Sequence, residues 1–150
     1  MTWPKFMQHD SIVEGHWPRL YAEFLDFQFA AYSEDTIAGV GNAVPIYWEE
    51  DFYRLPAGGL DWAMAKSVAD RKKGLDPNVL VGVQILINPE LQRKGLSYFF
   101  LDLMKGVAKN HGISHIALPV RPTQKHLYPL ISMEEYLTWT NQNMDPFDPW

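Results

Sequence analysis

A strand, a short polar loop and an amphipathic helix follow one another over residues 78–112, and this succession constrains the fold more than any other part of the sequence. Residues 78–89 have the sequence NVLVGVQILINP and are apolar on both faces apart from Gln84, which is typical of a central strand. Pro89 ends the strand, and the segment LQRKGLS leads into a helix. The strand therefore joins the helix through a polar loop that carries two cations and one glycine.

The helix after this loop is followed by a second strand. Its apolar residues recur at helical spacing and form one stripe: Leu96, Phe99, Phe100, Leu103, Met104 and Val107. Gly112 suits the position after the last turn, and residues 113–120 then have the pattern of a strand. This predicts a β-loop-α-β unit with a right-handed crossover, whose strands are parallel or locally splayed.

Three elements are predicted upstream: a helix over residues 17–29, a β-hairpin over residues 27–48 and a helix over residues 60–73. Pro18 is placed in the first turn of the first helix, and Asp61 is the cap candidate of the second, which ends at Gly74. Pro45, with two glycines nearby, indicates a bulge or a strand edge in the hairpin. Together the elements predict an α+β (α/β) fold, a mixed central sheet flanked by helices.

The last thirty residues differ in character from the rest. They are rich in proline, polar and aromatic residues, and they show one short helix, opened by the capping-box pair Ser132 and Glu135. The chain has 150 residues, which predicts a single domain over residues 1–150. Because no strand is visible in the tail, two alternatives stay open: a domain truncated at its C-terminus, or a sheet edge completed by a second copy in a homodimer.

Composition limits the classes of partner. The formal net charge is −5, which gives no general attraction for nucleic acid or an anionic membrane. No cysteine is present, and no apolar stretch is long enough to span a membrane or to form a signal peptide. His111 and His115 are four apart, but Gly112 should end the helix between them, so no metal site is predicted. We expect a cytoplasmic protein that acts on a small molecule.

The loop between strand and helix has the properties of an anion site. Amides in the first turn of a helix lack internal partners, and the helix dipole adds positive potential there. Arg93 and Lys94 add charge, and Gly95 lets the backbone approach a ligand closely. The loop is neither G-x-G-x-x-G nor the Walker A pattern G-x-x-x-x-G-K-[ST], which excludes those two kinds of nucleotide site.

Residues 92–97, QRKGLS, resemble the pyrophosphate loop [Q/R]-x-x-G-x-[G/A] of the GCN5-related N-acetyltransferase (GNAT) superfamily. Gln92 and Gly95 fit this pattern, whereas Ser97 departs from it, and the elements over residues 27–120 come in the family's order. The resemblance implies the GNAT acyl-CoA N-acyltransferase fold and an acetyl-CoA or other acyl-CoA co-substrate. Its pantetheine arm would lie along residues 85–88, beside a splayed neighbouring strand at 116–120. The implied CoA-binding residues are Ile85, Leu86, Ile87, Gln92, Arg93, Lys94, Gly95, Leu96 and Ser97.

Acyl transfer needs a base for the nucleophile and an acid for the departing thiolate. Many members of the family use a tyrosine after the strand that corresponds to residues 116–120, which here implies Tyr128 as the acid, with His126 as a candidate base. The alternative is that Tyr128 packs and His126 is solvated.

Candidate substrate-binding residues lie outside the loop. Arg121 would recognise an acidic substrate or the 3′-phosphate of CoA, and Trp48 is a core or cleft-wall residue. Asn42, in an apolar strand, either satisfies a bulge or faces the substrate cleft. The acidic residues 49–51 would receive a cationic amine or form a solvated loop.

The resemblance implies an acyltransferase that moves an acetyl or other acyl group from acyl-CoA to an acceptor, expected to be an amine. Two alternatives remain. The tail is similar to GNAT-like domains of polyketide loading modules, which implies decarboxylation of an acyl-CoA or S-acyl transfer. The other alternative is a non-catalytic domain that binds CoA or a protein.

Overall fold

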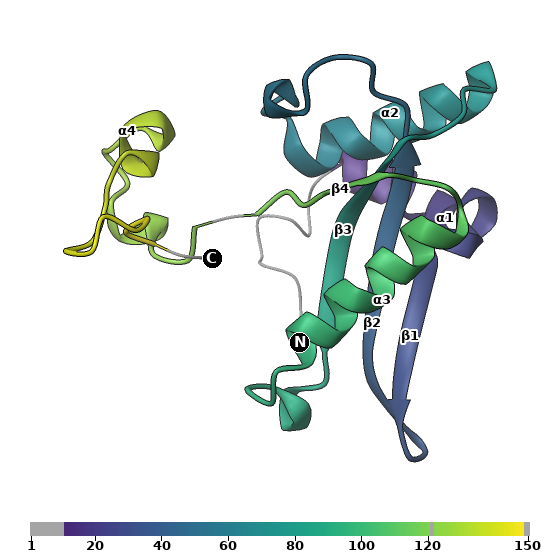
Figure 1. Cartoon of the computed structure of the whole chain (residues 1–150), viewed down its shortest axis with the longest axis horizontal. Coiled ribbons are helices and arrows are strands. Elements are labelled where there is room, and N and C mark those ends of the chain that lie inside the picture. Colours follow the sequence, from purple (N-terminus) through teal and green to yellow (C-terminus); the bar gives the residue numbers. More distant parts are fainter. Residues whose placement is uncertain (1–10, 121, 149–150) are drawn as a thin grey trace. The chain divides into compact units, whose positions relative to one another are not determined.

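The computed structural model describes residues 11–120 and 122–148, and it is drawn in Figure 1. The chain divides into two compact units, Met1–Pro119 and Val120–Trp150. The first unit contains α1 (Ser11–Glu23), β1 (Gln28–Ser33), β2 (Thr36–Ile46), α2 (Gly59–Lys73), β3 (Val79–Ile87), α3 (Leu96–Asn110) and β4 (His115–Ala117). The second contains α4 (Met133–Leu137). No helix in the described ranges is both long and apolar enough to cross a membrane.

The first unit is built on a four-stranded sheet in the order β1-β2-β3-β4. β1 with β2 and β2 with β3 are antiparallel, whereas β3 with β4 is parallel. The predicted mixed sheet, its hairpin and its central strand are therefore confirmed. Pro45 lies beyond the β1 pairing, which ends at Asn42, so β2 has a strand neighbour on one side only there, as the proline predicted.

Helices cover both faces of the sheet. On one face, α1 and α2 pack against alternate β3 residues such as Val79 and Val81 in a cluster that includes Leu20 and Met64. On the other face, α3 brings Met104 and Ala108 onto Ala43 and Leu80. In Figure 1, α3 crosses in front of the central strands. The uniformly apolar sequence of β3 is explained by this burial on both faces.

The first two helices differ in detail from the prediction. The helix predicted over residues 17–29 begins earlier, at Ser11, and ends at Glu23, so Pro18 lies inside it rather than in its first turn. Proline removes the hydrogen bond to the Glu14 carbonyl, but both residues are exposed, where water can replace it. The N-cap of α2 is Gly58 and not Asp61, which lies in the first turn, where the helix dipole still favours its charge. Gly74 ends this helix as predicted, in the left-handed conformation with φ of 66°.

The second unit is held together by aromatic rings. Tyr128, Tyr136, Trp139 and Phe147 contact one another with ring centroids 4.9 to 6.1 Å apart. The predicted cap of α4 is confirmed, because the Ser132 hydroxyl accepts a hydrogen bond from the Glu135 amide at 3.1 Å. This small core lies within the second unit, Val120–Trp150.

Candidate functional site

A β-bulge in β3 changes which side chains of this strand face α3. Ala43 of β2 pairs with Gly82, but the preceding residue Asn42 pairs with Gln84, so Val83 is an extra residue in β3. Val83 packs with the cluster of α1 and α2, whereas Ile85 packs with the cluster of α3. The bulge therefore turns the second half of β3 so that Ile85 lies on the side of α3.

Beyond the bulge, β3 also loses its second neighbour. β4 pairs only with residues 79–81 and lies beside only the upper, N-terminal end of β3 in Figure 1. The strand predicted within residues 113–120 is present but shorter than expected: β4 is His115–Ala117, so residues 118–120 of the expected wall at 116–120 do not pair with β3. Pro119 cannot donate to a ladder, which is one reason for the early end. From Gly82 to Ile87, β3 has β2 on one side and no described strand on the other.

The loop after β3 has an unusual backbone. Arg93 and Gly95 both have positive φ, at 62° and 78°. Gly95 is the N-cap of α3 and contributes no side chain, so the first amides of the helix lack a side-chain acceptor. The Gln92 side-chain amide donates to the Ile87 carbonyl at 3.2 Å and fastens the loop to the end of β3. A helix N-terminus is thus held open next to the unpaired half of the strand.

These elements enclose a cavity of about 300 Å³, which we name the loop pocket. It is lined by Ile85, Ile87, Leu91, Gln92, Arg93, Gly95, Leu96 and Ser97. The structure therefore brings together the predicted CoA-binding residues except Leu86 and Lys94. Leu86 lines a separate cavity with Ile37 and Gly39, because neighbouring strand residues face opposite sides. Sequence reasoning missed Leu91, an apolar residue in a polar loop.

Two cations, Arg93 in the loop pocket and Lys94 next to it in the sequence, are available for a ligand. Arg93 and Lys94 are exposed, and neither takes part in an ion pair within residues 11–120 and 122–148. Both lie within three residues of the uncapped end of α3. Two cations and a helix N-terminus together favour a multiply charged anion.

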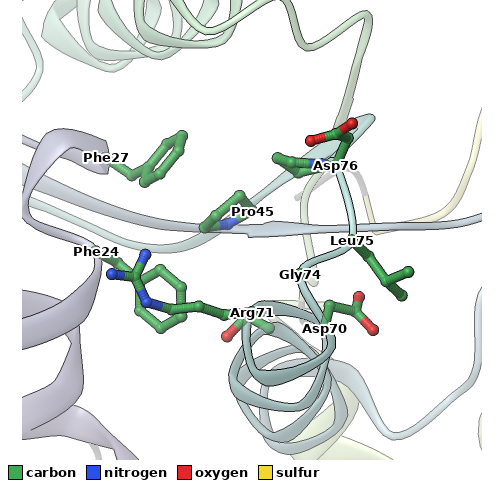
Figure 2. Close-up of a pocket in the computed structure, with 10 residues that line it drawn as sticks. Phe24, Phe27, Pro45, Asp70, Arg71, Gly74, Leu75 and Asp76 are labelled. Carbon is green, nitrogen blue, oxygen red and sulfur yellow. The ribbon is translucent and has the colours of Figure 1, made fainter.

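A larger cavity, of about 340 Å³, lies at the C-terminal end of α2 (Figure 2). Its buried polar groups already have partners. Asp70 accepts from the Tyr47 amide at 2.8 Å and from Lys66 at 3.0 Å, and the Ser67 hydroxyl donates to the Met64 carbonyl. Arg71 lies over the ring of Phe24. These groups hold α2 to its neighbours, so the smaller loop pocket is the better ligand site.

The three substrate-binding candidates have different surroundings. Asn42 is buried and donates to Gln28 Oε1 at 2.9 Å and to the Tyr21 hydroxyl at 3.2 Å, while its Oδ1 has no partner among the described residues. Trp48 is half-buried and packs edge-on against Trp62, with ring centroids 5.5 Å apart. Arg121 lies outside the described residues.

Both catalytic candidates lie in the second unit. The ring of Tyr128 packs 4.9 Å from that of Trp139, but no hydrogen bond within the described residues occupies its hydroxyl. His126 is exposed, and its Nδ1 lies 3.0 Å from the Thr123 carbonyl. A neutral ring that donates from Nδ1 leaves Nε2 as the proton acceptor. The packing of the Tyr128 ring is therefore compatible with a role of its hydroxyl as a proton donor.

A buried carboxylate, which sequence reasoning missed, organises this unit. Asp148 accepts from the Thr123 hydroxyl and the Gln124 amide at 2.6 Å, and from the Tyr136 hydroxyl at 2.9 Å. Burial alone would raise the pKa of Asp148, but these hydrogen bonds together lower the pKa below its usual value. Burial, followed by the bond to Asp148, raises the pKa of Tyr136 to about 12. The only signal in the sequence was an acid in an aromatic segment.

The two histidines considered for a metal have different partners. His111 lies against Phe27 with ring centroids 4.5 Å apart, and His115 stacks on Phe52 at 3.8 Å. No group of three or more potential metal-binding side chains occurs in the part of the chain that the structure describes.

Comparison with known proteins places the fold. No family model matches the chain. The solved loading GNATL domain of CurA from Lyngbya majuscula superposes with a TM-score of 0.68 and 21% identity, over 98% of this chain and 68% of that one. The chain has the GNAT fold. The fold implied by the resemblance of residues 92–97 is thereby confirmed.

One further solved structure is similar to this chain in fold, and one curated protein is similar to it in sequence. The GphF GNAT-like decarboxylase, solved in complex with isobutyryl-CoA, matches with a TM-score of 0.64 and 15% identity, over 98% of this chain and 70% of that one. The curated arginine N-acetyltransferase avaD of Aspergillus versicolor is 24% identical over 164 residues. That alignment includes 99% of this GNAT-like chain, which spans 56% of the length of avaD.

Proposed function

We propose that this GNAT-like chain binds acyl-CoA in the loop pocket and transfers the acyl group to an acceptor, expected to be an amine. One observation carries the proposal: the half of β3 without a second neighbour ends at an uncapped helix N-terminus beside Arg93 and Lys94. CoA has a matching arrangement, because its extended pantetheine arm is joined to a charged diphosphate. The pocket thus offers matching chemistry at both ends.

The diphosphate would be bound at the N-terminus of α3. The amides near Gly95 supply hydrogen bonds without competition from a capping side chain, and positive φ at residues 93 and 95 turns the backbone around the anion. Arg93 and Lys94 add charge-assisted contacts. The Gln92 side chain donates to the Ile87 carbonyl and thereby holds the loop against the end of β3.

The pantetheine arm would lie along the second half of β3. Its two amides are able to pair with the backbone of Gly82–Ile87 as an added strand does, because β4 has already ended. Ile85 and Ile87 offer apolar contacts on the same side as the loop. The thioester would then lie near the bulge at Val83.

For transfer to an amine, the nitrogen attacks the thioester carbonyl and the C–S bond breaks. In this proposal Nε2 of His126 takes the proton from the amine, and the Tyr128 hydroxyl protonates the departing thiolate. Their local geometry supports these roles, since the Thr123 carbonyl orients the ring of His126 and no hydrogen bond from the described part of the chain occupies the Tyr128 hydroxyl. The aromatic cluster fixes the ring of Tyr128.

Calorimetry with CoA and acetyl-CoA tests the binding step. We expect micromolar to submillimolar dissociation constants that weaken with added salt, because screening reduces the contribution of exposed cations. Transfer is tested by thiol release from acetyl-CoA with arginine and a panel of primary amines. Absence of binding at near-millimolar ligand would show the proposal to be wrong.

A second candidate is decarboxylation of a malonyl-type acyl-CoA, in which the C–C bond to the carboxylate breaks, CO₂ leaves and a proton replaces it. The match to two GNAT-like structures over 98% of the chain, which includes the unusual tail, favours this candidate. Incubation with malonyl-CoA and no amine distinguishes the two. Formation of acetyl-CoA supports decarboxylation, whereas consumption of acetyl-CoA only with an amine supports N-acyl transfer.

A further inference from the structure

Two side chains from different elements meet over Gly82, where β3 and β4 separate. A Cβ atom on Gly82 would lie 2.5 Å from Leu118 Cδ2 and 2.7 Å from Met104 Cε. Real atoms do not approach so closely, so residue 82 must be glycine while both side chains occupy this position. Leu118 is the first residue after β4, and Met104 comes from the middle of α3.

The two side chains differ in exposure. Met104 is fully buried and belongs to the core under α3, whereas Leu118 is 41% exposed. Truncating Met104 would open the core, but truncating Leu118 shortens a side chain that already borders solvent. Leu118 is therefore the adjustable member of the pair.

The position of Leu118 matches the expected end of the pantetheine arm. Gly82 precedes Ile87 by five residues, which correspond to about 16 to 17 Å of extended strand. Pantetheine, with two amide units and a cysteamine, spans a similar length when extended. An arm that starts at the loop and follows β3 thus brings its sulfur, and the acyl group beyond it, to Leu118.

We propose that Leu118, backed by Met104, determines which acyl groups the chain accepts and restricts them to acetyl and similarly short chains. This assignment rests on the proposed function. Leu118 is a specificity-determining residue here and takes no part in proton transfer. Removing part of its side chain makes room for a longer acyl chain at the point where β3 and β4 separate.

The test is calorimetry of the whole chain with CoA, acetyl-CoA, butyryl-CoA and hexanoyl-CoA. We expect the unaltered chain to bind CoA and acetyl-CoA similarly and hexanoyl-CoA at least tenfold more weakly. Leu118→Ala should bring hexanoyl-CoA to within about threefold of acetyl-CoA, since each newly buried methylene contributes about a fourfold gain in affinity. The dissociation constant of CoA itself should not change.

Two further variants complete the experiment. Leu118→Val removes one carbon and should give a smaller change of the same sign. Leu25→Ala truncates another exposed leucine of the first unit, 63% exposed, and should leave the acyl series unchanged. If CoA binds but Leu118→Ala and Leu118→Val show the same relative affinities for the four CoA compounds as the unaltered chain, the assignment of Leu118 is wrong and the CoA site stands. If the unaltered chain does not bind CoA, both proposals fail.

Discussion

The loop at residues 92–97 and the segment at residues 123–128 are both dense in reactive groups, yet the structure uses them differently. In the loop, Arg93 and Lys94 make no ion pair in the described chain and α3 begins without a side-chain cap. In the segment, the side chain of Thr123 and the amide of Gln124 are bound to Asp148, and Lys125 donates to the Tyr128 carbonyl.

This difference separates groups that folding consumes from groups that remain for a ligand. A hydrogen-bonded, buried group stabilises its own unit and has little capacity left for chemistry. In residues 123–128, the Tyr128 hydroxyl and Nε2 of His126 are the groups to which we assign proton transfer. The loop, in contrast, is the part of the chain whose backbone and charges suit an anion. The predictions below test this distinction.

The largest effect is expected for Tyr128→Phe. Loss of a general acid lowers turnover by about 10²-fold or more, while CoA affinity and the aromatic packing should be retained. The assay is thiol release, or acetyl-CoA formation from malonyl-CoA, whichever the unaltered chain performs. Tyr32→Phe, at a tyrosine that is 67% exposed, is the matched control. Equal turnover of both variants would mean that Tyr128 only packs.

Gly95→Val should weaken CoA binding about 100-fold. Gly95 has φ of 78°, which a β-branched residue adopts only with strain, and a side chain there would cover the amides of the helix N-terminus. Gly106→Ala is the control, because it lies within α3 and a Cβ there meets no atom within 4 Å. This control should bind normally and stabilise the chain by about 0.5 to 1 kcal/mol. Normal CoA binding by Gly95→Val would contradict the assignment of the loop.

Replacing Arg93 and Lys94 together by alanine should weaken CoA binding roughly 10- to 30-fold, since each contributes one exposed charge-assisted contact. The dependence of the dissociation constant on salt should also become shallower. The double variant Lys72→Ala and Lys73→Ala removes two cations from the last turn of α2 and should change neither quantity. A similar loss in both double variants would indicate a general effect of net charge.

The smallest effect near neutral pH concerns the second unit. The lowered pKa of Asp148 stabilises the fold above its usual value of 3.8, and this contribution is lost as pH falls through the folded-state pKa. The raised pKa of Tyr136 adds stability below pH 10 that is lost as pH rises toward 12. Near-ultraviolet circular dichroism should therefore be constant between pH 5 and pH 9 and should lose its aromatic signal at both extremes.

Asp148→Asn tests whether Asp148 causes the acid transition. Asp145→Asn is its control, because Asp145 is exposed. The first should weaken the aromatic signal already at neutral pH and abolish the acid transition. The second should leave both unchanged. An acid transition that persists in Asp148→Asn would assign it to another carboxylate.

Local patterns predicted much of the fold. The hairpin, the helices that became α2 and α3, and the central strand each had a periodicity or a glycine that marks an end, and each was confirmed. Errors arose where tertiary context overrides such signals. Pro18 suggested a helix start, but it lies inside α1 on the exposed face of the helix, where water can replace the lost hydrogen bond. The apolar run after β4 suggested a longer strand, but Leu118 and Val120 are exposed and pair with no strand of the described chain.

The sequence by itself determined the order of the elements and the nature of the loop, because Gln92, Gly95 and the amphipathic stripe of α3 are local properties. The tertiary structure decided that Val83 forms a bulge and, together with Pro119, that β4 ends at Ala117. Both result from hydrogen bonding between strands that are distant in sequence. An apolar strand buried on both faces has no alternation for a bulge to interrupt, so its sequence does not show where the site opens.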